Sequence, residues 1–236
     1  MINNYLGGVT YFYAKKNMKI VEQSVKVIYP GTIEAGINEL RLIEIAGRNC
    51  WRSEGKMDEE SYRKFIENLR KRGHDSPLEF AHIMYELVTS RDVMAELTRH
   101  RIGVSFCIES QRYVDESASG DIEFIRPLFF KENPDDIKKP YADTEFYRSM
   151  IWQDQMENIE QSYKVMRQNG SKNQDARKVL PNSAATRIMM KVNLRELLHI
   201  YGLRSSPAAY PEMRELMRLL KIETDKVFPG FLPEEG

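Results

Sequence analysis

Residues 80–114 read FAHIMYELVTSRDVMAELTRHRIGVSFCIESQRYV, and the order of the elements in this stretch decides the fold class. Phe80 to Val88 has the composition of a strand. Thr89 and Asp92 give a capping signal for a short helix that ends near His100. Ser105 to Val114 predicts a second extended segment. A strand, a short helix and another strand favour an α+β arrangement over a purely helical one.

On either side of this stretch the sequence predicts further strands and helices, and it contains no G-x-G-x-x-G segment, so a Rossmann cofactor site is not expected. The whole pattern predicts an α+β fold with a mixed or antiparallel sheet and flanking helices. We expect a single domain over residues 1–236, with residues 1–20 as a candidate N-terminal extension. The expected strands cover 21–29 and 188–192; the expected helices cover 34–49, 58–72, 146–168, 175–180, 193–199 and 211–227; a turn is expected at 74–77 and a loop at 129–141.

The composition excludes several classes of function. Lys and Arg together number 35, as do Asp and Glu, so the formal net charge of the 236 residues is zero. A general nucleic-acid binder usually carries a basic excess, so we expect neither a nucleic-acid partner nor, without a long apolar run, a membrane partner. Met1 to Gly8 shows no signal-peptide pattern, and the expected location is cytoplasmic. Two cysteines are too few for a disulfide framework.

The most unusual segment is Arg-His-Arg at residues 99–101, which Glu-Ser-Gln-Arg-Tyr at residues 109–113 follows closely. At a helix end, three successive side chains of this kind fan out. They can then reach separate anionic groups such as the phosphates of two ligands, a task that suits the planar guanidinium fork. The alternative is that they are solvated cations that complement a helix C-terminus. Local physics leaves both interpretations open.

This segment resembles the signature of the flavin-dependent thymidylate synthases, which is Arg-His-Arg, seven residues, then Ser, usually continuing to Arg-Tyr. Here eight residues separate Arg101 from Ser110, and the extra residue falls within residues 102–104. Ile108 stands where the family often has Gln or Glu. Three further segments are similar to the family in order and spacing: HDSPLEFAH at 74–82, ARKVLP at 176–181 and NLRELLHIYGLR at 193–204.

The resemblance, which covers about residues 50–226, implies an activity. It implies reductive methylation of dUMP to dTMP, with methylenetetrahydrofolate as carbon donor and with FAD that NADPH reduces. It also implies that no cysteine nucleophile takes part, and in this sequence Cys107 has no adjacent base that would activate its thiol. The substrates would be dUMP, a folate and a nicotinamide nucleotide. The family also implies a homotetramer with its sites at subunit interfaces.

The resemblance further implies roles for individual residues. Arg204 would be the catalytic residue that faces the uracil and favours its ionisation at N3. Glu96 stands where the family usually has Gln, and an acid there could bind a sugar hydroxyl but would repel a phosphate. The residues implied to bind FAD are His74, Ser76, Arg99, His100, Arg101, Asn193, Arg195 and His199. The residues implied to bind dUMP are Glu96, Arg99, Ser110, Gln111, Arg112, Arg177 and Arg204.

Two other hypotheses compete with the flavin enzyme. A metal-dependent hydrolase could use the four histidines, although no set of ligands has a suitable spacing and no metal site is expected. A nucleic-acid-binding module could use residues 99–112. Individually, Asn193 is more often a helix N-cap, and Arg177 is more often part of a solvated helix face.

Overall fold

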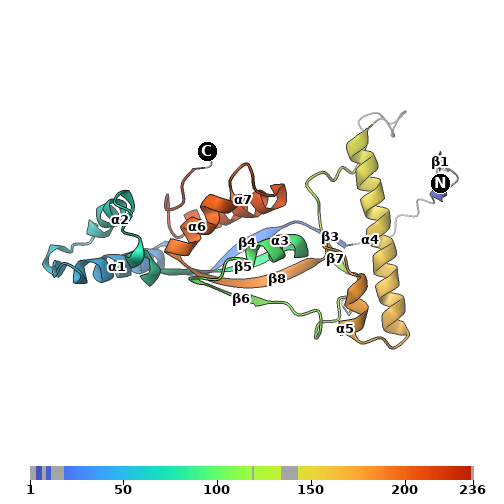
Figure 1. Cartoon of the computed structure of the whole chain (residues 1–236), viewed down its shortest axis with the longest axis horizontal. Helices are drawn as coiled ribbons and strands as arrows, with labels where there is room; N and C mark the ends of the chain where they lie inside the picture. The colour runs from blue at the N-terminus through green and yellow to red at the C-terminus, as the bar shows by residue number, and fades with distance from the viewer. Residues whose placement is uncertain (1–3, 7–8, 12–18, 119, 134–142, 235–236) are drawn as a thin grey trace. The chain divides into compact units, whose positions relative to one another are not determined.

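The computed structural model describes residues 4–6, 9–11, 19–118, 120–133 and 143–234 (Figure 1). The chain divides into two compact units. One unit holds residues 22–110, 125–128 and 185–236, and we call it the sheet unit. The other holds residues 1–21, 111–124 and 129–184, and we call it the helical unit.

An antiparallel sheet of four strands in the order β4-β5-β8-β6 forms the centre of the sheet unit. The two central strands pair along their whole length, from His82 opposite Asn193 to Ser90 opposite Ala185. Buried and more exposed residues alternate along both strands, so one face of the sheet carries the core. The strands are β4 (Ser24–Tyr29), β5 (His82–Ser90), β6 (Val104–Ile108) and β8 (Ala185–Asn193).

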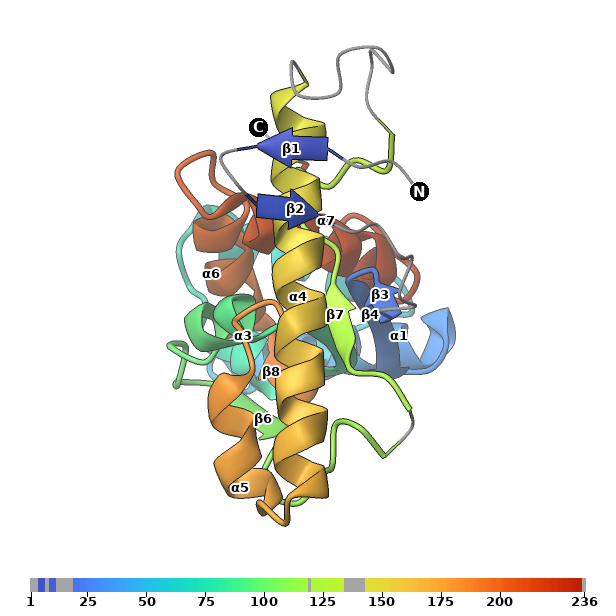
Figure 2. The same cartoon turned by 90° about the vertical axis from the view of Figure 1, so that its right-hand side faces the viewer.

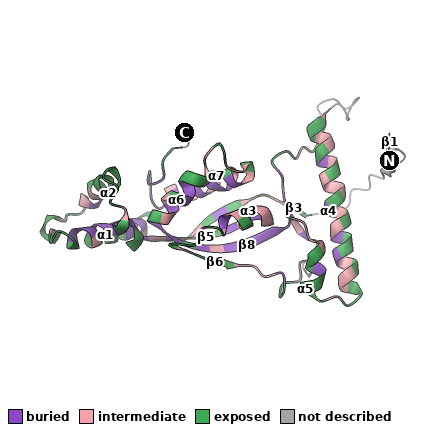
Figure 3. Ribbon diagram, in the orientation of Figure 1, coloured by how far each residue is buried: buried purple, intermediate pink, exposed green. Residues whose placement is uncertain are grey.

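Helices supply the other side of that core. Leu97 of α3, Leu197 of α6 and Leu216 of α7 are fully buried together with Tyr85 and Ile188 of the sheet. Figure 3 shows buried residues along β8 and buried and exposed residues alternating on α6 and α7. The helices of this unit are α1 (Ile33–Asn49), α2 (Ser61–Lys71), α3 (Arg91–Leu97), α6 (Leu194–Arg204) and α7 (Pro211–Asp225), with short 3-10 turns η1 (Glu54–Lys56) and η2 (Ser76–Phe80).

The helical unit is built on the long helix α4, beside which α5 lies (Figures 1 and 2). Its own core contains Ile122, Phe124, Met156, Tyr163 and Ala176. Its helical elements are α4 (Thr144–Gln168), α5 (Asn173–Ala176) and the 3-10 turn η4 (Arg177–Val179). Two two-stranded sheets accompany them: β1 (Asn4–Leu6) pairs antiparallel with β2 (Val9–Tyr11), and β3 (Lys19–Val21) pairs with β7 (Glu123–Ile125), whose last residue belongs to the sheet unit.

The α+β class and the antiparallel sheet are confirmed, and most predicted elements are present within a few residues of their expected bounds. Asn193 caps α6, because its side-chain oxygen accepts a hydrogen bond from the backbone N–H of Glu196 at 2.8 Å. Pro211 begins α7 at the position where its missing N–H costs nothing. Of the described helices, none combines the length and the apolar character needed to cross a bilayer.

Some expectations were wrong in detail. The extended segment ends at Ile108: Glu109 still donates its N–H to Arg187 O at 2.9 Å, but the chain then leaves β8 and turns at residues 111–113. The N-cap of α3 is Ser90, not Thr89. The turn at 74–77 leads into a 3-10 turn, and the strand at 21–29 is interrupted at residues 22–23. Residues 134–141 of the expected loop lie outside the described residues, and β7 was not expected.

Candidate active site

The Arg-His-Arg segment begins where α3 ends. Two backbone hydrogen bonds, Arg99 N to Glu96 O at 3.3 Å and His100 N to Leu97 O at 3.2 Å, continue the last turn of the helix. The side chains then diverge as the sequence predicted: His100 is buried at 9% exposure, whereas Arg99 and Arg101 are exposed. The two arginines therefore present cations to solvent on either side of a buried imidazole.

The loop after this segment is fixed to the start of α6. Gly103 has a φ of +73°, a conformation that glycine adopts without the steric cost of a Cβ. Its carbonyl accepts a hydrogen bond from the backbone N–H of Asn193 at 2.9 Å. A Cβ at Gly103 would lie 2.4 Å from Asn193 Nδ2, so the loop backbone lies directly against the side chain that caps α6. The inserted residue therefore falls in a loop of defined path.

Four side chains of the sheet unit form one hydrogen-bonded chain. His100 Nδ1 lies 3.1 Å from Glu196 Oε1, and the Arg204 Nε–H donates to His100 Nε2 at 3.1 Å. Arg204 also donates from Nη1 to Glu96 Oε2 at 2.9 Å and from Nη2 to the Glu96 carbonyl at 3.0 Å. The chain thus runs from α6 to the loop after α3, back to the end of α6, and then to α3.

The protonation state of His100 follows from its surroundings. Burial lowers the pKa of its imidazole below the ordinary value; the adjacent carboxylate of Glu196 opposes this shift, and the Arg204 cation reinforces it. His100 is therefore neutral at pH 7. Because Nε2 accepts from Arg204, the proton of the neutral ring is assigned to Nδ1, which donates to Glu196.

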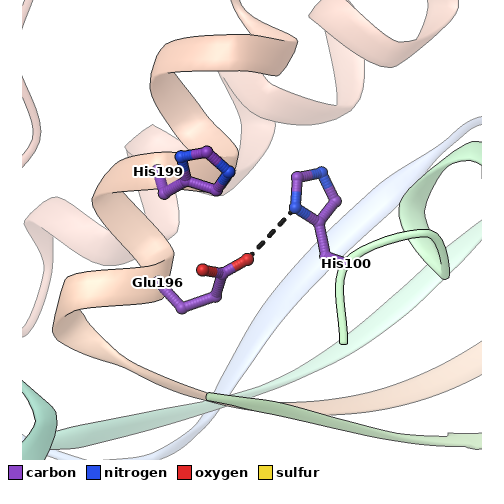
Figure 4. Close-up of side chains that lie close together, drawn as sticks. All are labelled: His100, Glu196 and His199. Carbon is purple, nitrogen blue, oxygen red and sulfur yellow. Dashed lines mark hydrogen bonds and ion pairs between the residues drawn. The ribbon is translucent and has the colours of Figure 1, made fainter. Parts of the chain in front are cut away.

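His199 completes this cluster (Figure 4). Its ring lies 5.7 Å from that of His100, edge to face, and the ligand atoms of His100, Glu196 and His199 all lie within 4.8 Å of one another. Two histidines and a carboxylate can hold a transition metal. Here, however, Nδ1 of His100 holds a proton toward Glu196 and Nε2 accepts from Arg204, so neither nitrogen offers a lone pair to an ion. The expectation of no metal site stays a prediction.

The other residues implied to bind FAD lie around the first turn of α6 and η2. Arg195 Nη1 pairs with Glu79 Oε1 at 2.6 Å, and both side chains are about half exposed, which joins α6 to η2. Ser76 is the exposed first residue of η2. His74 is exposed and stacks on Trp51, with the ring centroids 6.2 Å apart. The eight residues that the family resemblance implies for FAD binding all belong to the sheet unit.

The residues implied to bind dUMP are divided between the units. Glu96, Arg99, Arg204 and Ser110 belong to the sheet unit, and Ser110 is half-buried just after β6. Gln111, Arg112 and Arg177 belong to the helical unit, where Gln111 is buried and both arginines are exposed.

Two residues of the site carried no role in the sequence analysis. Glu196 lies three residues after Asn193, a spacing typical of a helix-capping box, and that common structural use hid its contact with His100. Glu79 lies inside the segment 74–82 that resembles the family. The sequence pattern itself marked this position, but only the structure shows its partner, Arg195.

Comparisons with known proteins identify the family and agree with this fold. A family model described as thymidylate synthase complementing protein matches residues 33–230. A flavin-dependent thymidylate synthase of Geobacter sulfurreducens is 32% identical over 213 residues, which are 82% of this chain and 86% of the relative. One of Haloarcula marismortui is 33% identical over 185 residues, covering 73% of this chain and 74% of the relative.

Two solved structures share the fold. Thymidylate synthase X of Helicobacter pylori, determined with FAD and dUMP, has a TM-score of 0.65 and 23% identity, and covers 90% of this chain and 100% of its own. PolB of Streptomyces cacaoi, a UMP/dUMP methylase bound with 5-Br dUMP, has a TM-score of 0.70 and 22% identity, and covers 91% of this chain and 95% of its own. At these identities the likeness concerns the fold alone.

The fold and the site define an α+β protein in which two exposed arginines flank a buried, hydrogen-bonded histidine. The match over residues 33–230 makes the assignment specific: the chain belongs to the Thy1 family and is an enzyme of the flavin-dependent thymidylate synthases. This agrees with the family resemblance in the sequence, and it favours the flavin hypothesis over the metal-dependent hydrolase and the nucleic-acid-binding module.

Proposed function

We propose that this protein methylates dUMP to dTMP, taking the carbon from methylenetetrahydrofolate and using FAD that NADPH reduces. The observation that carries the proposal is the Arg99–Arg101 segment, which His100 joins to Glu196 and Arg204 of α6, together with the family match over residues 33–230. The proposal includes a single domain over the chain, a homotetramer with its sites at subunit interfaces, and a cytoplasmic location.

The residues present fit a dinucleotide cofactor. Within the part of the chain that the structure describes, Arg99 and Arg101 have no acidic partner, so their cations are available to a diphosphate. FAD would be held by the eight residues His74, Ser76, Arg99, His100, Arg101, Asn193, Arg195 and His199. The bound flavin would supply the hydride that completes the methyl group. Arg195 would have to exchange its partner Glu79, which is feasible for a pair about half exposed.

The nucleotide-binding residues also fit an anionic ligand. Gln111 is buried, and its side-chain Nε2 has no hydrogen-bond partner among the described residues. A buried amide donor of this kind calls for an acceptor, which an oxygen of the nucleotide would supply. Ser110, Arg112 and Arg177 would hold dUMP with it, and the exposed guanidinium of Arg177 would contact the phosphate.

Arg204 is the proposed catalytic residue. Uracil C5 is a weak nucleophile, and a cation that stabilises negative charge on the ring raises the electron density at C5. Arg204 donates from Nε to His100, and from Nη1 and Nη2 to the carboxylate and the backbone carbonyl of Glu96. We propose that uracil oxygens replace Glu96 as partners of these two nitrogens. Glu96 would then accept a hydrogen bond from a sugar hydroxyl.

A visible absorption spectrum of the purified protein is the first test. We expect flavin bands that bleach when NADPH is added without oxygen, and dTMP formation that requires dUMP, methylenetetrahydrofolate and NADPH together. A colourless protein that cannot be reconstituted with FAD would contradict the proposal, and zinc analysis would then follow.

The same assay should compare dUMP with UMP, because PolB, which shares the fold, is a UMP/dUMP methylase. We expect dUMP to be the better substrate by kcat/KM. Faster methylation of UMP would keep the flavin chemistry and overturn the proposed substrate.

A further inference from the structure

Glu196 carries the observation that goes furthest beyond the proposed roles. It is the third residue of α6, and in a helix-capping box a glutamate at that position reaches back to the N–H of the N-cap residue. In this chain that N–H is already used, since Asn193 N donates to Gly103 O at 2.9 Å. The Glu196 carboxylate turns instead to His100 Nδ1 at 3.1 Å.

The burial of these groups makes the contact strong. The side chain of His100 is 7% exposed and that of Glu196 is 15% exposed, so solvent screens their hydrogen bond little. The backbone N–H of Glu196 is held by Asn193 Oδ1 at 2.8 Å, which fixes the start of the side chain. On the other side of the ring, the Arg204 side chain is 18% exposed where it donates to His100 Nε2.

The geometry points to Glu196 as a positioning residue: its carboxylate holds the His100 imidazole in the Nδ1–H tautomer, so that Nε2 stays an acceptor that fixes the catalytic Arg204. This inference rests on the proposed function, in which Arg204 faces the uracil. A second proton on His100 would remove that acceptor and place two cations side by side. Activity should therefore fall as pH drops through the pKa of His100.

Burial and neighbouring groups set the pKa of His100, and therefore the pH at which activity falls. The carboxylate of Glu196 favours the imidazolium, whereas burial, Arg204 and His199 disfavour it. The charged or titratable groups around His100 are Glu196, His199 and Arg204 on α6, Glu96 on α3 through Arg204, and Arg99 and Arg101 beside it in the chain.

The test uses two variants of the FAD-loaded full chain and a matched control. Glu196→Ala removes the acceptor, and we expect kcat to fall at least about 10-fold, the scale of losing one hydrogen bond to a charged group. Glu196→Gln keeps an acceptor oxygen, and we expect it to retain most of the activity. In this variant the loss of activity at acid pH should move to lower pH, because the Glu196 carboxylate that favours the His100 imidazolium is gone. The control Glu215→Ala removes a helix carboxylate that, among the described residues, pairs only with Arg218 on α7, away from His100, and it should behave as wild type.

Nitrogen-15 spectra of histidine-labelled protein give a readout independent of turnover. We expect His100, assigned with a His100→Gln variant, to be protonated on Nδ1 in wild type and in Glu196→Gln. In Glu196→Ala the Nε2–H tautomer should become populated.

The outcomes separate the two proposals. A wild-type chain that binds no flavin or does not methylate dUMP sinks the proposed function, while the spectra still decide the tautomer. An active wild type in which His100 carries its proton on Nε2 overturns the role of Glu196. So does a Glu196→Ala variant with wild-type kcat and pH profile, or a Glu196→Gln variant as impaired as Glu196→Ala.

Discussion

A methyl group added at Gly103 would test how firmly the Arg-His-Arg loop is fixed to α6. The residue has a φ of +73°, and its new Cβ would lie 2.4 Å from Asn193 Nδ2 and 3.0 Å from Asn193 Cγ. Asn193 cannot move aside freely, because its Oδ1 caps α6 through the N–H of Glu196. Gly103→Ala therefore strains the loop backbone and also disrupts the helix cap.

The two costs can be estimated separately. A non-glycine residue in the left-handed conformation costs about 1–2 kcal/mol, and loss of an N-cap side chain costs about 0.5–2 kcal/mol. Gly103→Ala should therefore lower the free energy of unfolding by about 1.5–4 kcal/mol. It should also weaken FAD binding, since the loop carries three of the proposed cofactor ligands.

Urea unfolding followed by circular dichroism measures this loss, and two variants separate its parts. Gly230→Ala has a similar φ of +68° with no atom within 4 Å of its Cβ, so it should show only the backbone cost. In an Asn193→Ala background, Gly103→Ala should cost less than in wild type, because the clash is gone. If Gly103→Ala costs less than about 0.5 kcal/mol, or if its cost is unchanged without the Asn193 side chain, the reasoning is refuted.

Three further predictions concern chemistry and stability. Arg204→Ala should abolish dTMP formation while flavin absorbance stays, and retained turnover would remove Arg204 from the mechanism. Cys107→Ala should stay active, because this exposed thiol serves no nucleophilic step, and an inactive but folded variant would argue for a cysteine mechanism. Burial and the neighbouring Asp92 raise the pKa of Glu212, so the folded chain holds this proton more tightly than the unfolded chain does, and stability falls as pH rises past the ordinary glutamate range. Glu212→Gln should therefore raise Tm more at pH 8 than at pH 4, and an offset that does not change with pH would refute this assignment.

The sequence by itself determined the local elements and the family. Periodicity and end signals predicted α1, α4 and α7, and Pro211 and Asn193 begin their helices as their backbone chemistry requires. Spacing within four segments carried the family resemblance, because each segment brings its own residues together over a short stretch of chain. The antiparallel sheet also followed from the order of strands and helices.

Tertiary structure alone decided which distant side chains meet. Glu96 and Arg204 are 108 residues apart, and His100 and Glu196 are 96 residues apart, yet all four form one hydrogen-bonded chain. No local pattern indicates such contacts, since they depend on packing α3 and α6 on the same face of the sheet. The sequence did not reveal the end of β6 at Ile108 either. A strand ends where its backbone pairing with the neighbouring strand stops, here the pairing with β8, and residue propensities do not contain that information.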